Sequence, residues 1–289
     1  MSVDLTITQK GLFKKTLPLS VILGDRLHYG SYDDSWRLKN GELAEREFIA
    51  YLPDAIARGF SVTWNNLEKH SVDMRLLTPT GREEIKEFYA AVSRIMKYWN
   101  ADLLVEGEKV SLERWTAGSG DYIDFNTRVL HDICQKIEDG EIREYTLFSA
   151  LWPLTIGKEE AHSFIDDPGA FDSWLSEKQS IDVYYAGPRF YRTENGIIGR
   201  YVLSENVRSV FPLKPEVPFG MTDPETGNQL KCDNFLVSFF SFTKDGFIGE
   251  LNYDSFIRRL PSEKTSRYDQ KNCIIEQMDL GELQELVSD

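Results

Sequence analysis

Residues 41–53 read GELAEREFIAYLP, and residues 249–261 read GELNYDSFIRRLP. Gly, Glu, Leu, Phe, Ile, Leu and Pro recur at the same seven of thirteen positions. A recurrence of this kind is typical of repeated structural units and has to be settled before the fold is assigned. It predicts two similar lobes, in which each copy forms a helix that ends at its proline. Proline ends a helix because it lacks an N–H and clashes with the preceding turn.

The segments downstream of the two copies also correspond. After the first copy, an apolar run at residues 72–77 precedes TGRE at residues 80–83. After the second copy, a run at residues 273–278 precedes DLGE at residues 279–282. An oxygen-bearing side chain followed three residues later by Glu indicates the start of a helix. The order of helix, strand and capped helix therefore occurs twice, which favours an internal duplication. Chance similarity is the alternative.

Short strands and helices alternate along the chain without the regular spacing of a parallel α/β fold. The clearest helix runs from Ile85 to Trp99, where apolar residues form one stripe at helical spacing. The second half of the chain is mostly strand-like and contains two hairpins. These patterns predict an α+β fold with two lobes of mainly antiparallel sheet and packed helices. We expect an N-terminal lobe at residues 1–144 and a strand-rich C-terminal lobe at residues 145–289.

The composition is that of an acidic globular protein. The chain of 289 residues is 41% hydrophobic and has a formal net charge of -14. This charge disfavours a general affinity for nucleic acid, which requires clustered Lys and Arg. Cys134, Cys232 and Cys273 suit neither a disulfide framework nor a CxxC metal site, so we expect free thiols in a reducing compartment. The absence of a signal-peptide pattern and of a membrane-spanning apolar run favours a cytoplasmic protein without a membrane partner.

Motifs that identify a reaction are absent from the sequence. It contains no nucleotide-binding glycine motif, no serine-hydrolase elbow and no HExxH zinc motif. His28, His70, His131 and His162 occur singly, so we expect neither a metal site nor a cofactor. The glycine loop at residues 117–121 precedes a helix and could bind an anion on its N–H groups, but a linker is the simpler interpretation. These absences favour a non-enzymatic protein.

Residues 189–203 predict a hairpin that carries the best candidate ligand site. Asn195-Gly196 suits a two-residue turn in which both central residues have positive φ. In the register that this turn sets, Tyr191 lies opposite Arg200, and Arg189 shares their face. Arginine beside tyrosine could hold an anion or stack on a nucleobase. A solvated sheet face with arginine lying over tyrosine is the alternative.

A proline-rich segment at residues 212–229 predicts an irregular surface loop in the second lobe. Its Phe219 and Met221 are the candidate partner-binding residues. We therefore expect a non-enzymatic protein-binding or regulatory protein that acts on another protein. The alternative is an enzyme or a binder for a small anionic metabolite, centred on the hairpin. A pocket lined by arginines or paired carboxylates would favour this alternative, whereas an exposed apolar patch would favour protein binding.

Two stretches resemble a known family. Residues 76–99, LLTPTGREEIKEFYAAVSRIMKYW, and residues 249–261 are similar to segments of bacterial proteins of similar length that are grouped only as a domain of unknown function. The resemblance implies a bacterial cytoplasmic protein. It carries no activity, ligand or catalytic residue that could be transferred to this chain.

Overall fold

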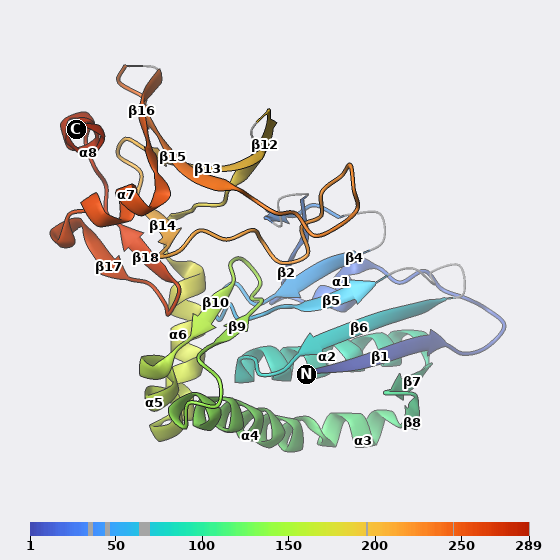
Figure 1. Cartoon of the computed structure of the whole chain (residues 1–289). Coiled ribbons are helices and arrows are strands. Elements are labelled where there is room, and N and C mark those ends of the chain that lie inside the picture. Colours follow the sequence, from blue (N-terminus) through green and yellow to red (C-terminus); the bar gives the residue numbers. More distant parts are fainter. Residues whose placement is uncertain (34–36, 44–46, 64–69, 195, 245, 289) are drawn as a thin grey trace. The chain divides into compact units, whose positions relative to one another are not determined.

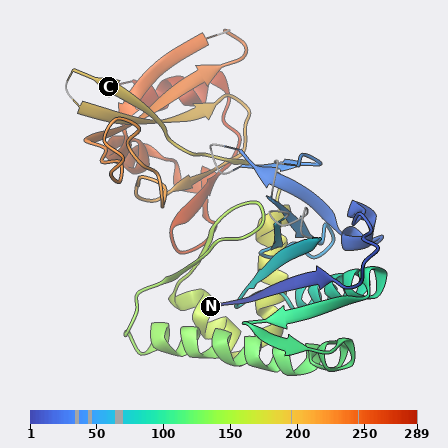
Figure 2. The ribbon, with the colours of Figure 1, turned by 90° about the vertical axis from the view of Figure 1, so that its right-hand side faces the viewer.

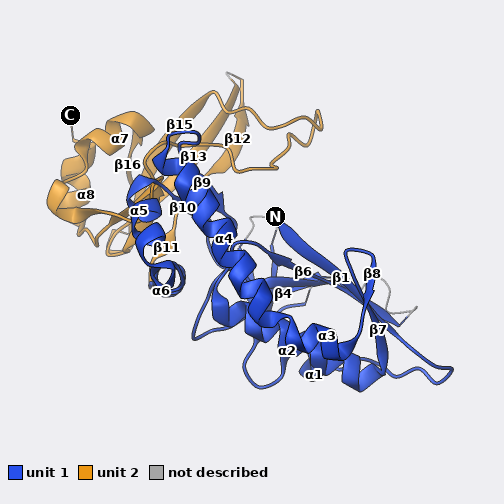
Figure 3. Ribbon diagram, turned by 90° about the horizontal axis from the view of Figure 1, so that it is seen from below, with its two compact units in different colours: residues 1–181 blue, residues 182–289 orange. Residues whose placement is uncertain are grey.

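The computed structural model describes residues 1–289 apart from residues 34–36, 44–46, 64–69, 195, 245 and 289. The chain forms two compact units, Met1–Ile181 (unit 1) and Asp182–Asp289 (unit 2), which Figure 3 colours separately. The boundary expected at residues 144–145 falls inside unit 1. The segment that follows it stays with unit 1 because helix α5 (Lys158–Asp166) packs against helix α4 (Ser119–Glu138).

Unit 1 is built on an antiparallel sheet that has eight strands within its described residues. The strands lie across the sheet in the order β3 (Leu38–Asn40), β2 (His28–Tyr32), β4 (Glu47–Tyr51), β5 (Phe60–Thr63), β6 (Ser71–Leu77), β1 (Ser2–Gln9), β7 (Ala101–Val105) and β8 (Glu108–Val110). Alternate side chains of β1 explain its two faces: Val3, Leu5 and Ile7 are buried, whereas Asp4 and Thr6 lie on the open polar face.

Helix α2 (Arg82–Trp99) covers the apolar face of this sheet (Figure 1 and Figure 2). Its apolar stripe from Ile85 to Trp99 is buried, which confirms the helix predicted from the spacing. The remaining elements of unit 1 are α1 (Leu19–Leu23), α3 (Leu112–Ala117), α6 (Pro168–Ser180) and the antiparallel pair β9 (Tyr145–Leu147) and β10 (Leu154–Ile156). Helices α4, α5 and α6 pack on one another.

The described part of unit 2 contains two four-stranded sheets. One has the order β11 (Tyr184–Tyr185), β14 (Ser209–Pro212), β18 (Asn272–Ile275) and β17 (Thr265–Arg267). The other has the order β12 (Arg189–Thr193), β13 (Gly196–Ser204), β15 (Asn234–Ser241) and β16 (Gly246–Asn252). The pairs β11–β14 and β13–β15 are parallel, and the other neighbouring pairs are antiparallel.

The core of unit 2 is aromatic. Helices α7 (Tyr253–Arg259) and α8 (Leu280–Val287) contribute to it, and a short 3₁₀ turn (Ser262–Lys264) follows α7. Tyr201 and Tyr253 pack with their ring centroids 4.9 Å apart, and the Tyr253 hydroxyl donates to the Pro212 carbonyl at 2.7 Å. Both units are thus mainly antiparallel sheet with packed helices, which confirms the predicted α+β class.

The two copies of the GEL sequence form different secondary structure. In the described part of the first copy, residues 47–51 form strand β4. In the second copy, the GEL residues belong to β16, and helix α7 follows with the Asn252 side chain as its N-terminal cap. The first copy has Ala44 where the second has Asn252, and the shared Phe, Ile and Leu are apolar positions that suit either a strand or a helix. The predicted internal duplication is therefore wrong.

The downstream segments are also placed differently. Strand β6 lies between β5 and β1 in the large sheet of unit 1, whereas β18 lies between β14 and β17 in unit 2. Each strand is followed by a helix, as predicted. Asp279 and Glu282 form the expected capping box at α8. At α2 the cap is Gly81, and Thr80 instead donates its hydroxyl to Glu84.

Candidate functional site

The most exposed large apolar side chains among the described residues lie on the loop that follows β1. We call residues 10–15, KGLFKK, the basic–apolar loop. Its Leu12 is 96% exposed and its Phe13 is 93% exposed. Figure 1 shows the loop in blue beyond the end of β1. Burial of a Leu or Phe side chain is worth about 1.5–3 kcal/mol, so two adjacent ones left in water make this loop a candidate contact site.

Hydrogen bonds hold the stem of this loop on both sides. The Gln9 side-chain carbonyl accepts the Lys15 N–H at 2.9 Å, and the Lys14 ammonium donates to the Gln9 main-chain carbonyl. The Trp99 indole N–H donates to the Lys15 carbonyl at 2.8 Å. The Gln9 N–H donates to the His70 carbonyl at 2.9 Å. The stem is thereby fixed to the sheet and to the end of α2, while Leu12 and Phe13 project into solvent.

The basic–apolar loop is a positively charged feature of a negatively charged chain. Lys10 and Lys109 both pair with Asp102, at 2.9 and 2.7 Å. These two ammonium groups lower the pKa of Asp102. Lys14 and Lys15 form no ion pair within the described residues. Two ammonium groups therefore share the Asp102 carboxylate. Lys14 and Lys15 add a local positive charge to the loop in a protein with a net charge of -14.

The predicted hairpin is present as β12 and β13, but its register is shifted. Arg189, not Tyr191, lies opposite Arg200. The predicted register is wrong because the main-chain N–H and carbonyl of Ile197 bond to Asp233, not across the hairpin. Its N–H donates to the Asp233 carboxylate, and its carbonyl accepts the Asp233 N–H, both at 2.9 Å. Ile197 therefore cannot bond across the turn. The shift is two residues, which preserves the face on which each side chain lies.

Arg189, Tyr191 and Arg200 consequently lie on one face of the sheet, as predicted. The Arg200 guanidinium lies over the Tyr191 ring, 5.5 Å from its centroid. It also pairs with Glu250 at 2.9 Å, and Glu250 accepts the Ser238 hydroxyl at 3.0 Å. Within the part of the chain that the structure describes, the Arg189 side chain has no acidic partner. The face therefore offers one unneutralised cation beside an arginine that is already paired.

The proline-rich loop, residues 212–229, is irregular after the end of β14, as predicted. Phe219 is 81% exposed, whereas Met221 is half-buried. The following turn is ordered around Asp223, which accepts a hydrogen bond from Arg192 of β12 at 2.8 Å. Phe219 therefore presents most of its surface to solvent, and Met221 presents only part of its surface.

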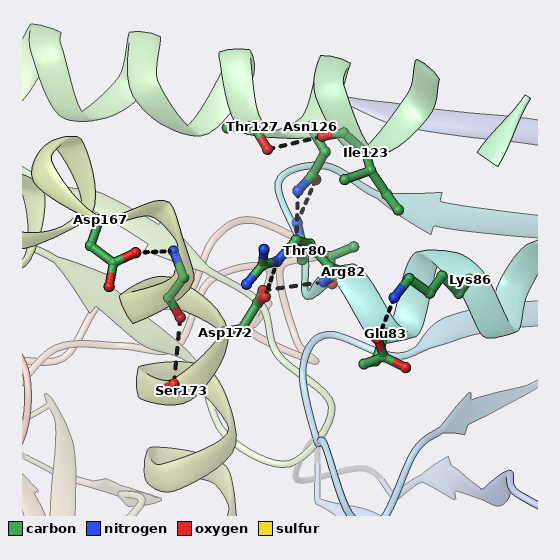
Figure 4. Close-up of polar contacts among 11 residues, drawn as sticks. Thr80, Arg82, Glu83, Lys86, Ile123, Asn126, Thr127, Asp167, Asp172 and Ser173 are labelled. Carbon is green, nitrogen blue, oxygen red and sulfur yellow. Dashed lines mark hydrogen bonds and ion pairs between the residues drawn. The ribbon is translucent and has the colours of Figure 1, made fainter. Parts of the chain in front are cut away.

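A buried polar network fixes the start of α2 (Figure 4). The Asn126 side chain of α4 accepts the Thr80 N–H at 2.8 Å and donates to the Thr80 carbonyl at 2.9 Å. Arg82 pairs with Asp172 of α6. These contacts join the N-terminus of α2 to two other helices of unit 1, and they account for the polar residues at this position.

The titratable pair Arg58 and Glu84 is buried in the same region. The Glu84 carboxylate accepts the N–H groups of Arg58 and Gly59, at 3.2 and 2.6 Å. The Arg58 guanidinium donates to the carbonyls of Phe148 and Pro79, at 3.0 and 3.2 Å. Burial raises the pKa of Glu84 and lowers the pKa of Arg58. Perturbed pairs occur at active sites and in structural networks alike. Here the contacts join chain segments to one another, so we assign the pair a structural role.

The described surface of unit 1 includes a larger and a smaller hollow. The larger, about 530 Å³, lies on the open face of the sheet and is lined mainly by polar side chains, including Asp4, Thr6, Asp73, Arg75 and Glu106. The smaller, about 300 Å³, lies between the β7–β8 hairpin and the junction of α3 and α4.

The described residues include no group of three or more His, Cys, Asp or Glu side chains that could hold a metal ion. None of the helices in the described ranges is long and apolar enough to cross a membrane.

Leu12 and Phe13 are the candidate functional residues that the sequence patterns missed. Their signal is a pair of large apolar residues placed after Gly11 and before two lysines, at the point where the strand alternation ends. That arrangement indicates a loop whose tip is apolar. It does not reveal whether the two side chains turn inward or outward, and only the structure shows that they turn outward.

Comparison with curated proteins and with solved structures finds no match. A family model matches residues 2–286, which is nearly the whole chain, and its description is "Domain of unknown function (DUF4299)". The match extends over both units and over the two stretches that suggested the resemblance. The chain therefore belongs to this family, the domain of unknown function DUF4299.

Proposed function

We propose that this protein is a non-enzymatic binding protein that docks on another protein through Leu12 and Phe13. The observation that carries the proposal is the near-complete exposure of both side chains on a loop whose stem is fixed by hydrogen bonds. A loop that is already ordered loses little conformational entropy on binding. More of the free energy gained by burying its apolar side chains then contributes to affinity.

The charge around the loop specifies the chemistry of the partner. Lys10, Lys14 and Lys15 flank the two apolar side chains. A partner that accepts them has an apolar pocket with aspartate or glutamate at its rim, because complementary rim charges steer association and exclude wrong partners. Such contacts weaken with salt. Phe219, on the proline-rich loop, is a second candidate contact, with Met221 beside it.

Site-specific photo-crosslinking tests this proposal in the cells that make the protein. A benzophenone amino acid at position 13 is expected to form an adduct with one protein. The same group at position 148 is the matched control, because Phe148 is an exposed aromatic residue of unit 1 outside the loop. The adduct from position 13 should disappear when Lys14→Glu and Lys15→Glu are introduced together.

Three outcomes contradict the proposal: no protein adduct from position 13, equal adducts from positions 13 and 148, or an adduct that survives the charge reversal. Adducts with lipid alone would assign the loop to a membrane surface and would also contradict it.

The second candidate function is binding of a small anion at the face of the β12–β13 hairpin. The observation that favours it is the presence of Arg189, Tyr191 and Arg200 on one face, with Arg189 lacking an acidic partner in the described chain. Each charge-assisted contact contributes about 1.5–3 kcal/mol. Pyrophosphate should therefore bind to the unmodified protein. It should bind more tightly to Glu250→Gln, because this change removes the carboxylate that pairs with Arg200. It should not bind detectably to a variant with both Arg189→Gln and Arg200→Gln. If pyrophosphate binds to neither the unmodified protein nor Glu250→Gln, this face does not bind small anions.

A further inference from the structure

We infer that the smaller hollow of unit 1 is a binding site for a free amino acid with an apolar side chain. It is independent of the docking loop, and its lining comes from three places in the chain. Tyr89 belongs to α2. Val105 and Val110 belong to the β7–β8 hairpin. The junction of α3 and α4 supplies the rest, namely Arg114, Trp115, Ala117, Gly118 and Asp121. Its volume is about 300 Å³, and it is a shallow hollow open to solvent rather than an enclosed cavity.

The floor of the hollow is aromatic and fixed. The rings of Tyr89 and Trp115 stack with centroids 4.0 Å apart and planes 8° apart. The Trp115 indole N–H donates to the Tyr89 carbonyl at 3.1 Å, which orients its ring. Trp115 is buried and Tyr89 is half-buried, so part of the aromatic surface faces solvent. With Val105 and Val110 beside it, this floor suits an aliphatic or aromatic side chain.

The rim of the hollow carries one charge of each sign. Arg114 and Asp121 are both exposed, and neither forms a salt bridge within the residues that the structure describes. Asp121 also lies close enough to Tyr89 to contribute to the raised pKa of that residue, which is about 12 mainly because of burial. Tyr89 is therefore protonated at neutral pH, and its hydroxyl can donate a hydrogen bond to a ligand.

These charges distinguish a zwitterion from other ligands. A ligand with only a negative charge would be repelled by Asp121, and a ligand with only a positive charge would be repelled by Arg114. A free α-amino acid presents a carboxylate, which an arginine binds with two parallel hydrogen bonds, and an ammonium group, which pairs with an aspartate. Its side chain then lies against Tyr89, whose ring stacks on Trp115. Gly118, at the junction of α3 and α4, has φ -80° and ψ -6°, so a residue with a side chain could adopt this backbone conformation without strain. A Cβ added at Gly118 would lie 3.4 Å from the Arg114 carbonyl oxygen, 3.5 Å from the Trp115 carbonyl oxygen and 3.7 Å from the Tyr89 ring.

Calorimetric titration with L-phenylalanine and L-leucine tests the inference on the full chain. Two derivatives of phenylalanine separate the charges: N-acetylphenylalanine lacks the ammonium group, and phenylalanine methyl ester lacks the carboxylate. We expect each derivative to bind at least tenfold more weakly than the free amino acid. Arg114→Gln and Asp121→Asn should each weaken binding of free phenylalanine at least tenfold. Asp121→Asn should also remove the preference over the N-acetyl derivative.

Matched controls lie on α4, the helix that carries Asp121. Arg128 and Asp124 are exposed residues of α4 outside the lining, so Arg128→Gln and Asp124→Asn should leave binding within twofold of the unmodified protein. Gly118→Val, which adds atoms to the lining of the hollow, should weaken binding at least tenfold. The inference is overturned if neither amino acid gives saturable binding. It is also overturned if the derivatives bind as well as the free amino acid, or if the controls weaken binding as much as the rim variants.

Discussion

Trp99 donates its indole N–H to the main-chain carbonyl of Lys15 at 2.8 Å, so the last residue of α2 is bonded directly to the stem of the basic–apolar loop. Trp99 is buried among the core residues of unit 1. The position of the exposed tip, Leu12 and Phe13, therefore depends on the core of unit 1 as well as on the loop. This link explains how two side chains can be presented to solvent on an ordered stem.

Replacing Trp99 by Phe tests this link. The change keeps an aromatic ring but leaves the Lys15 carbonyl without its donor. We expect the free energy of unfolding to fall by about 1–3 kcal/mol, and the amides of residues 10–16 to exchange hydrogen faster. The matched control is Trp115→Phe, which also removes a buried indole hydrogen bond but far from the loop in sequence. It should lower stability without accelerating exchange in residues 10–16. Equal exchange in the two variants would refute the link.

Asn126 should be essential for stability because it pairs with both backbone groups of Thr80, a fully buried residue. Asn126→Ala leaves one N–H and one carbonyl unsatisfied, each worth about 1–3 kcal/mol. We expect a loss of about 2–5 kcal/mol in the free energy of unfolding, measured in urea, although alanine is the better helix former. Gln135→Ala, an exposed change on the same helix, should stay within about 0.5 kcal/mol of the unmodified protein. Similar values for the two variants would sink this assignment.

The turn between β15 and β16 should respond to acid through Glu205. Its carboxylate accepts the hydroxyls of Ser241 and Thr243, at 2.6 and 2.7 Å. These hydrogen bonds lower the pKa of Glu205 from 4.5. Because the folded-state pKa lies below the unfolded value, the stabilisation is complete above about pH 4.5 and is lost as the pH falls through the folded-state value. The unmodified protein should therefore unfold at a higher temperature than Glu205→Gln at pH 6, and the gap should narrow towards pH 3. A gap that widens or stays constant on acidification would show that Glu205 does not act in this way.

The α+β class and the two long helices of unit 1 could be predicted because their apolar spacing is regular over many residues. The stripe from Ile85 to Trp99 fits only a helix, and α4 (Ser119–Glu138) begins at the glycine loop that the sequence places before a helix. The GEL sequences could not be assigned in the same way. Their shared apolar residues fit a strand in one copy and a helix in the other, and Asn252, present in only one copy, caps the helix.

The candidate sites were predicted in part. The face shared by Arg189, Tyr191 and Arg200 follows from strand alternation alone. It was therefore predicted correctly although the register was wrong by two residues. The register itself depends on Asp233, which lies in a different part of the sequence and binds Ile197. The exposure of Leu12 and Phe13 depends on how the loop leaves the sheet, which no local pattern specifies.

The most direct test of the account is the affinity between the purified protein and the protein that crosslinks at position 13. Leu12→Ser and Phe13→Ser together remove two apolar side chains worth about 1.5–3 kcal/mol each when buried. Surface plasmon resonance should therefore show the dissociation constant rising by about 100-fold or more, while Phe148→Ser leaves it within twofold. Affinity of the unmodified protein should also fall as salt is raised, because the flanking lysines contribute. A dissociation constant for the double variant within twofold of the unmodified protein would contradict the central claim that these two side chains form the docking site.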